Sequence, residues 1–377
     1  MMTGVTSPTT AIHRVLIIGL GLMGGSLGLA LRSLGRGVEV GGFDLDLATA
    51  TRAKELGAID DIEPAGFPGL AGYQLVIVAV PVRAIPPLLA RIAASASPGT
   101  ILMDIGSTKA FVHRELADLP EHVFYIGGHP MTGSEVEGLA GADRHLYENA
   151  VWILTDPRGD EPERVAARNA VTGLLEGIGA LVVPMDPDQH DRIVSMTSHL
   201  PYLAAVALVN ALRDRFPVAG EALSLAAGGF LDTTRVSAGP PPVYRDIVLT
   251  NAANIAAGID LLVAELTRMR DAMTAGAGDA LVASFGRARE LRAALPRFRK
   301  GFPVPFFELV VQAQDRPGFL GELATLLGQH RINIKDFVLM HVREGEPGTI
   351  LLAFRTEGDL TSALTALSSA GFVAFRR

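Results

Sequence analysis

An apolar segment followed at once by three spaced glycines constrains this chain more than any other feature. Residues 15–24 read VLIIGLGLMG, so a strand-forming run leads into Gly19, Gly21 and Gly24 in the spacing Gly-x-Gly-x-x-Gly. A second apolar run, residues 38–43, leads into Asp44, 20 residues beyond the last glycine. A glycine turn between a strand and a helix, with an acid after the next strand, predicts an α/β Rossmann domain.

The same turn predicts a dinucleotide site. Gly19 permits the tight turn, Gly21 lets the backbone approach a pyrophosphate, and Gly24 lets the following helix pack closely on the sheet. Leu22 and Met23 open that helix, so we expect their backbone amides to face the phosphates.

Asp44 predicts which cofactor is bound. A carboxylate at this place accepts hydrogen bonds from the adenine-side ribose and repels a 2′-phosphate, so we expect NAD and not NADP. The alternative is a glycine-rich turn of an α/β domain that binds no nucleotide. The strand, glycines, helix, second strand and acid occur in register, which favours the nucleotide.

Composition narrows the class of protein. The chain has 377 residues, 49% of them hydrophobic, and a formal net charge of −7 with no marked basic cluster outside residues 297–300. We therefore expect no nucleic-acid partner. The chain contains no cysteine, which excludes disulfides and thiol catalysis, and it shows no signal peptide and no apolar run of about 18 residues. These features favour a cytoplasmic protein without a membrane segment.

Apolar patterns divide the chain into three domains. Strand-like runs alternate with helical patterns in the first half, which predicts a parallel sheet with helices on both faces. Ala- and Leu-rich helices follow, several of them apolar around most of their circumference, and we expect a homodimer through these helices. The predicted order is a disordered N-terminus (1–12), a NAD-binding Rossmann domain (13–185), an all-α substrate and dimerisation domain (186–295), a linker (296–304) and a small domain (305–377).

The small C-terminal domain has a signature of its own. Its patterns follow the order βαββαβ, which predicts a ferredoxin-like α+β fold. The turn QDRPGFL and a later INI segment resemble the opening of an ACT domain, an amino-acid-binding module found in many metabolic enzymes. The resemblance implies that Asp315, Gly318, Asn333 and Ile334 bind an effector, most simply an aromatic amino acid. The alternative is a purely structural appendage.

Further motifs follow the glycine turn in a characteristic order. They are DIGSTK (104–109), GGHPMTGSE (127–135), SHLP (198–201) and DTTR (232–235). The first two follow predicted strands, whose carboxyl ends face the same crevice as the glycine turn. The set resembles the prephenate dehydrogenase family. Together with the ACT-like turn, the resemblance covers the chain from about residue 15 to its end.

The resemblance implies an NAD-dependent oxidative decarboxylation of prephenate to 4-hydroxyphenylpyruvate, a step in tyrosine biosynthesis. His129 matches the family's catalytic histidine, and a neutral imidazole suits a base that takes the hydroxyl proton near neutral pH. Ser107 matches the serine that bonds the substrate hydroxyl and orients the nicotinamide; alternatively, it caps the next helix. Lys109 is either part of this site or a solvated residue of that helix's first turn.

Substrate-binding residues are implied in the same way. Arg235 matches the arginine that holds a substrate carboxylate, with an interhelix ion pair as its alternative. Ser198 and His199 lie in the SHLP motif, and Tyr202 stands where the family commonly has a second histidine. This departure keeps arogenate open as the substrate. Glu135 matches an acid linked to gating and effector response, with helix capping as its alternative.

Two other classes of protein compete with this interpretation. A β-hydroxyacid dehydrogenase shares a Rossmann domain and a helical second domain, but those enzymes use a lysine on a helix and have no counterpart of these histidine motifs. An NAD-linked amino-acid sensor without catalysis would keep both binding modules. His190 and Asp191 suggest a metal ion, but His190 and His199 are nine residues apart, off one helical face, so we predict no metal site.

Overall fold

The computed structural model describes most of the chain, namely residues 12–35, 37–133, 136–156, 159, 161–216, 220, 224–294, 307–314, 316–340 and 348–376. The chain divides into two compact units, Met1–Ala283 and Ser284–Arg377. The first unit contains the predicted nucleotide-binding domain and most of the predicted helical domain. Apart from Ile12, the predicted N-terminal segment lies outside the described residues, and so does the whole predicted linker.

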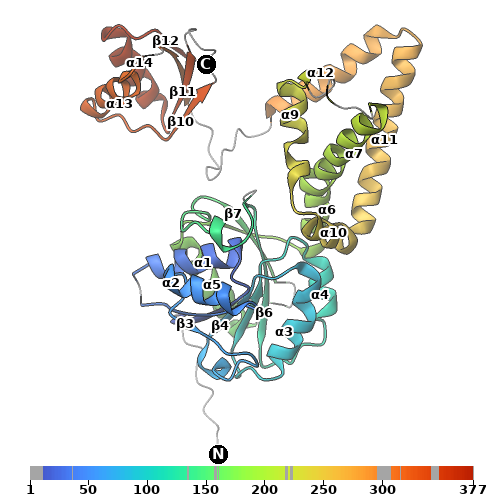
Figure 1. The fold of residues 1–377 in the computed structure, drawn as a ribbon, viewed down its shortest axis with the longest axis vertical. Helices are drawn as coiled ribbons and strands as arrows, with labels where there is room; N and C mark the ends of the chain where they lie inside the picture. Colours follow the sequence, from blue (N-terminus) through green and yellow to red (C-terminus); the bar gives the residue numbers. More distant parts are fainter. Residues whose placement is uncertain are drawn as a thin grey trace, which may run out of the picture. The chain divides into compact units, whose positions relative to one another are not determined.

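Eight strands of the described chain form one sheet, in the order β3-β2-β1-β4-β5-β6-β7-β8 (Figure 1). They are β1 (Arg14–Ile18), β2 (Glu39–Phe43), β3 (Asp61–Ile62), β4 (Leu75–Val78), β5 (Ile101–Asp104), β6 (Phe124–Pro130), β7 (Val151–Thr155) and β8 (Leu181–Pro184). All neighbours pair in parallel except β6 and β7, which are antiparallel. The six strands from β3 to β6 in this order therefore run in one direction, as expected, whereas β7 and β8 run in the opposite direction. The described part of the β6–β7 connection contains no crossover α-helix, which a parallel pair would require.

Helices cover both faces of this sheet, as expected. They are α1 (Leu22–Ser33), α2 (Leu47–Glu55), α3 (Ile85–Ala93), α4 (Ala110–Glu115) and α5 (Pro162–Gly177), with short 3-10 turns η1 (Leu70–Gly72), η2 (Val82–Ala84) and η3 (Leu139–Gly141). In β1, Val15 and Ile17 pack on the core beneath α1, α2 and α5, whereas Leu16 and Ile18 pack on the core beneath α3 and α4. Burial of both faces explains why this strand reads as a continuous apolar run.

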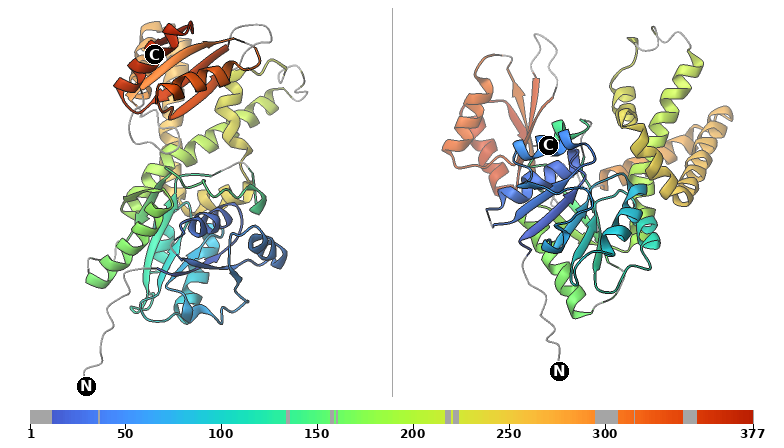
Figure 2. Two further views of the ribbon diagram at one scale, coloured as in Figure 1. Left: turned by 90° about the vertical axis from the view of Figure 1, so that its left-hand side faces the viewer. Right: turned by 60° about the horizontal axis from the view of Figure 1, so that its bottom comes forward.

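The rest of the first unit is helical, as expected (Figure 2). Its elements are α6 (Pro187–Val194), a π-helical turn η4 (Ser195–His199), α7 (Leu200–Arg215), α9 (Gly228–Thr234), η5 (Arg235–Ala238), α10 (Pro241–Thr250), α11 (Ala252–Thr274) and α12 (Gly278–Ala294), which runs on into the second unit. The continuous helix Pro187–Arg215 is long and apolar enough to cross a membrane by length and composition alone. This is weak evidence, because core helices of globular domains meet the same criteria.

The remainder of the second unit contains β9 (Phe307–Ala313), α13 (Phe319–Gln329), β10 (Asp336–Met340), β11 (Gly348–Phe354), α14 (Glu357–Ser369) and β12 (Ala374–Arg376). The strands form a small antiparallel sheet in the order β10-β11-β9-β12. This is the predicted βαββαβ order. Leu309 and Ile350 from the sheet pack with Leu323 and Leu367 from the two helices in one core. The INI segment precedes its strand, because β10 begins only at Asp336.

Candidate active site

A cavity of about 740 Å³ brings most of the predicted site residues together. It lies within the first unit, between the carboxyl ends of the sheet strands and the helical part. The predicted residues that line it are Gly21, Leu22, Met23, Ser107, His129, Ser198 and His199. Arg235, at the start of η5, and Tyr202 are not among the lining residues, and Glu135 lies outside the described residues.

The glycine turn has a shape that only glycine allows at two positions. Gly19 has a φ of +93°, and a Cβ there would lie 2.5 Å from the carbonyl oxygen of Ala79. A Cβ on Gly24 would lie 1.9 Å from the carbonyl oxygen of Gly19. Gly21, in contrast, faces open space on the cavity side. The turn thus leaves its backbone accessible at the start of α1, as a bound pyrophosphate requires.

Asp44 is held against the glycine turn. One carboxylate oxygen accepts a hydrogen bond from the amide of Leu20 at 2.8 Å, and the other accepts from the amide of Asp46 at 3.0 Å. The next residue, Leu45, is 94% exposed and brings no positive charge that could hold a 2′-phosphate. The residues present therefore fit NAD better than NADP.

His129 begins a chain of hydrogen bonds. Its Nδ1 lies 2.8 Å from Nε2 of His190, and Nδ1 of His190 lies 2.8 Å from Oδ1 of Asp191. An ionised carboxylate only accepts hydrogen bonds, so His190 carries its proton on Nδ1 and accepts at Nε2 from His129. His129 is then left with an unprotonated Nε2, the form that a general base requires. Burial lowers the pKa of His129 well below 6.5, and His190 and Lys109 lower that pKa further.

Asp191 also holds the segment that follows Ser107. Its Oδ1 accepts from the amide of Lys109 at 2.8 Å, and its Oδ2 accepts from the amide of Ala110 at 3.0 Å. These amides open α4, so a carboxylate from α6 caps that helix from outside. Lys109, not Ser107, is the N-cap residue of α4, and Ser107 lines the cavity instead. The alternative interpretation of Ser107 as a helix cap is therefore wrong.

Lys109 is fully buried, so its interpretation as a solvated residue is wrong. Its ammonium pairs with the carboxylate of Asp104 and donates to the carbonyl oxygen of Gly128 at 2.7 Å. Tyr125 donates to the other oxygen of Asp104 at 2.6 Å. Burial lowers the pKa of Lys109, and the Asp104 carboxylate opposes that shift. The pair ties the end of β5 to the backbone immediately before His129.

His199 reaches the cavity from the π-helical turn. Pro201 has no amide hydrogen to continue the α-helical pattern, and the amide of Leu200 donates to Ser195, five residues back. Such turns are frequent at functional sites. This one places Thr197, Ser198 and His199 together on the cavity wall. Burial lowers the pKa of His199 to about 4, so the ring is neutral at physiological pH.

Tyr202 does not line the cavity but packs against a residue that does. Its ring stacks on that of Tyr244, with centroids 3.4 Å apart and planes 2° from parallel. Tyr244 lines the cavity, whereas Tyr202 is 8% exposed and lies behind it. Burial raises the pKa of Tyr244, and Tyr202 raises it further, so the phenol stays protonated. The pair forms an aromatic part of the wall.

The sequence analysis missed His190, Asp191 and Tyr244 as site residues. It considered His190 and Asp191 only as metal ligands, and among the described residues there is no group of three His, Cys, Asp or Glu side chains that could hold a metal ion. Their adjacency at the start of a helix was the only available signal. Tyr244 carried no signal, because its position depends on how α10 packs.

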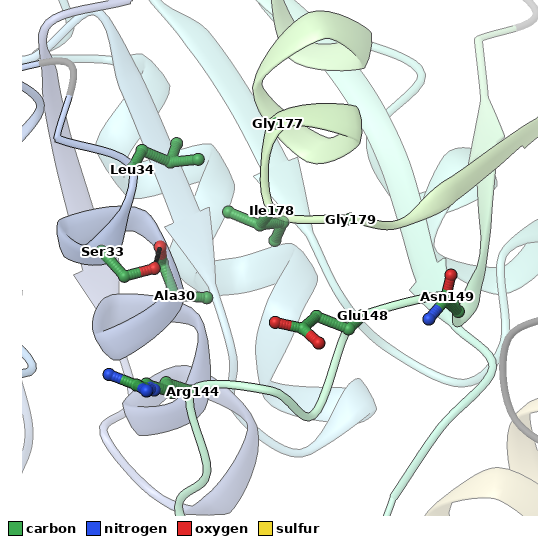
Figure 3. Close-up of a pocket in the computed structure, with 9 residues that line it drawn as sticks. All are labelled: Ala30, Ser33, Leu34, Arg144, Glu148, Asn149, Gly177, Ile178 and Gly179. Carbon is green, nitrogen blue, oxygen red and sulfur yellow. Dashed lines mark hydrogen bonds between the residues drawn. The ribbon is translucent and has the colours of Figure 1, made fainter. Parts of the chain in front are cut away.

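A second cavity, of about 530 Å³, lies between α1 and the end of α5 (Figure 3). In Figure 3, Glu148 points into it and Arg144 lies at its border. None of the residues predicted to bind cofactor or substrate lines this cavity. The larger cavity is therefore the candidate active site.

A glycine turn and a buried histidine at one cavity, with an acid after β2 bonded to that turn, are typical of a dinucleotide-dependent dehydrogenase. Comparison with protein families specifies the kind of dehydrogenase. Residues 27–184 match the nucleotide-binding domain of prephenate dehydrogenase, and residues 186–287 match its dimerization domain. The chain belongs to the prephenate dehydrogenase family, whose members are NAD-dependent oxidoreductases.

Similar proteins support this assignment along most of the chain. A prephenate dehydrogenase of Bacillus subtilis (strain 168) is 34% identical over 348 residues, covering 92% of this chain and 93% of the relative. A solved prephenate dehydrogenase from A. aeolicus, in complex with hydroxyphenyl propionate and NAD+, is 28% identical with a TM-score of 0.66, covering 75% of this chain and 98% of that one. The arogenate dehydrogenase of Synechocystis is 26% identical with a TM-score of 0.64, covering 74% and 99%.

Proposed function

We propose that His129 is the general base in the NAD-dependent oxidative decarboxylation of prephenate. The hydrogen-bond chain from His129 through His190 to Asp191 carries this proposal, because it leaves the Nε2 lone pair of His129 free for the proton of the substrate hydroxyl. The glycine turn and Asp44 bind NAD, which accepts the hydride when bound. As the proton arrives, the Asp191 carboxylate stabilises the positive charge shared by the two imidazoles.

The other polar residues of the cavity position the substrate in this proposal. Ser107 and His199 hold oxygen atoms of prephenate, and Ser198 lies next to His199 on the π-helical turn. Tyr244, supported by Tyr202, provides a flat surface for the ring. The roles predicted for Arg235 and Glu135 stay predictions.

Replacement of His129 tests the central role. General base catalysis contributes about 10²- to 10⁴-fold, so kcat of His129→Asn should fall by that factor while the Kd for NAD is unchanged. His145→Asn, at an exposed histidine, is the matched control. A His129→Asn enzyme with near-normal kcat would remove His129 from the mechanism.

Arogenate is a second candidate substrate, favoured by the charge of the cavity. The described lining contains Glu137 and Asp246 but neither lysine nor arginine, and the Asp246 carboxylate is already paired with Arg245 at 2.8 Å. Arogenate carries an ammonium group where prephenate carries a ketone, and this group would be attracted by Glu137. Steady-state kcat/KM for both substrates with NAD decides the question. Glu137→Gln should lower kcat/KM for arogenate more than for prephenate.

Arg235 is the residue predicted to hold a substrate carboxylate. If it reaches the substrate in the working enzyme, Arg235→Ala should raise KM for prephenate by an amount equivalent to about 2–5 kcal/mol. Arg213→Ala, at an exposed arginine of α7, is the control. An unchanged KM together with a lower free energy of unfolding would support the ion-pair alternative.

A homodimer through the helical domain is supported by its exposed apolar side chains. Leu261, Leu266, Met273, Val282 and Phe285 on α11 and α12 are each more than half exposed. Apolar surface of this extent usually marks an interface. Sedimentation should show a dimer that Leu266→Glu weakens, whereas Leu47→Glu, at an exposed leucine of α2, should leave it intact. We also propose a cytoplasmic location, which cell fractionation would test.

The C-terminal module is the proposed effector-binding domain, of the ACT type. Its βαββαβ order and a cavity of about 230 Å³ at the turn before α13 support this. Gly318 and Phe319 line that cavity, while Asn333 and Ile334 do not; Asp315 lies outside the described residues. The alignment with the Bacillus relative, at 348 residues, extends well into this unit.

Calorimetry of the full-length chain with tyrosine, phenylalanine and tryptophan tests the effector site. Gly318 has a φ of +88°, so Gly318→Val should distort the turn and weaken binding. Gly328→Val, within α13, is the control. Inhibition that is competitive with prephenate and unaffected by Gly318→Val would place the amino acid in the active site instead.

A further inference from the structure

Asn251 lies at a sharp corner of the helical domain, beside the active-site histidines. α10 and α11 are bent by 94° at this residue, and its side chain is buried, with 4% of the residue exposed. A buried amide must satisfy its hydrogen bonds within the protein. Its partners are the backbone of Asp191, the ring of His199 and the side chain of Asn254 in α11.

The orientation of the Asn251 amide follows from its partners. Its Nδ2 donates to the backbone carbonyl of Asp191 at 2.8 Å, and its Oδ1 accepts from Nδ2 of Asn254 at 2.8 Å. A flipped amide would place oxygen against the Asp191 carbonyl and NH2 against the Asn254 NH2. Both contacts would be repulsive, so the NH2 group is fixed on the histidine side.

This orientation determines the protonation of His199. The same Nδ2 lies 3.3 Å from Nδ1 of His199, and an amide NH2 only donates. Nδ1 of the neutral ring must therefore be unprotonated, and the proton sits on Nε2. His199 is thus a hydrogen-bond donor through Nε2, whereas His129 is an acceptor through the same atom.

We propose that Asn251 is a positioning residue that holds His199 as a neutral Nε2–H donor for a substrate oxygen. Asp191 links the two histidines, since its carboxylate orients His129 through His190 and its carbonyl orients the Asn251 amide. One segment of α6 therefore holds His129, the base, and His199, the donor, in opposite tautomers. The claim that His199 donates to a substrate oxygen rests on the proposed function, whereas the tautomer of His199 does not.

Nitrogen-15 NMR of histidine-labelled enzyme tests the tautomer without substrate or mutation at Asn251. The His199 signal, identified by its loss in His199→Gln, should show a protonated Nε2 and an unprotonated Nδ1. A ring protonated on Nδ1 would overturn the inference, and would do so whether or not the enzyme turns over prephenate.

Kinetics of Asn251→Asp test the role in binding. A carboxylate cannot donate, so His199 must turn its Nδ1–H toward residue 251 and lose its donor on the cavity side. We expect KM for prephenate to rise about 10-fold with kcat changed by less than about 3-fold, because the interaction is made in the ground state and the transition state alike. Asn169→Asp, at an exposed asparagine of α5, controls for the added charge. An unchanged KM with an inverted His199 tautomer would remove His199 from substrate binding, and a lower kcat alone would contradict a positioning role.

Discussion

His190→Leu is the most informative perturbation of the proposed mechanism. It removes the acceptor that lies 2.8 Å from His129 Nδ1 and leaves the two backbone amides on Asp191 in place, so α4 stays capped. In the productive tautomer, the Nδ1–H of His129 would then be buried without a partner, which costs about 1–3 kcal/mol. The other tautomer avoids this cost by turning its proton toward the cavity, but it cannot act as a base.

This cost predicts the size of the kinetic effect. A population shift of about 1–3 kcal/mol against the productive tautomer lowers kcat about 5- to 150-fold. The loss should therefore be smaller than that of His129→Asn. Steady-state kinetics with saturating NAD and prephenate measure it, and urea unfolding shows whether the fold is kept.

His113→Leu is the matched control. His113 is hydrogen-bonded like His190, with Nε2 2.8 Å from Oγ1 of Thr155, and is partly buried, but it makes no contact with His129 and does not line the cavity. It should lose stability without a comparable loss of kcat. A folded His190→Leu enzyme with kcat within about two-fold of the wild type would refute the tautomer argument. A loss as large as that of His129→Asn would show that His190 takes part in the proton transfer itself.

Three further predictions follow from the same contacts. Burial lowers the pKa of His129, so its base form persists as the pH falls below 6.5 and kcat/KM should fall only at a lower pH. A pH profile of kcat/KM with an acid midpoint above 6.5 would contradict this. Asp44→Ser should raise kcat/KM with NADP relative to NAD, since the carboxylate that repels a 2′-phosphate is gone, and a wild-type preference for NADP would overturn the assignment. Lys109→Met should lower the free energy of unfolding by about 3–5 kcal/mol in urea titrations, because it leaves the buried Asp104 carboxylate without its counter-charge; Lys109→Met with Asp104→Leu should recover part of that loss.

Much of the first unit could be predicted because its signals are local. A strand buried on both faces must be apolar throughout, and the turn after β1 must contain glycine where the backbone has a φ of +93°. The antiparallel direction of β7 could not be predicted in this way. It depends on how the β6–β7 connection returns, and a buried strand has the same composition in either direction.

The site residues that were missed act through partners distant in sequence. Asp191 bonds the amide of Lys109, 82 residues away, and His190 bonds His129, 61 residues away. No spacing rule connects such pairs, because they meet only when α6 packs against the sheet. Lys109 shows the same limit: a lysine at the start of a helix is usually solvated, and only the tertiary fold buries it beside Asp104.

These contacts make the chemistry depend on both parts of the first unit. Ser107 and His129 belong to the sheet domain, but Asp191 on α6 caps the helix after Ser107 and, through His190, sets the tautomer of His129. A small displacement of α6 would therefore disturb the base and the serine together, even with the NAD-binding turn intact. Cofactor affinity and catalytic rate should for this reason respond to different substitutions, the first to changes around Asp44 and the second to changes in α6.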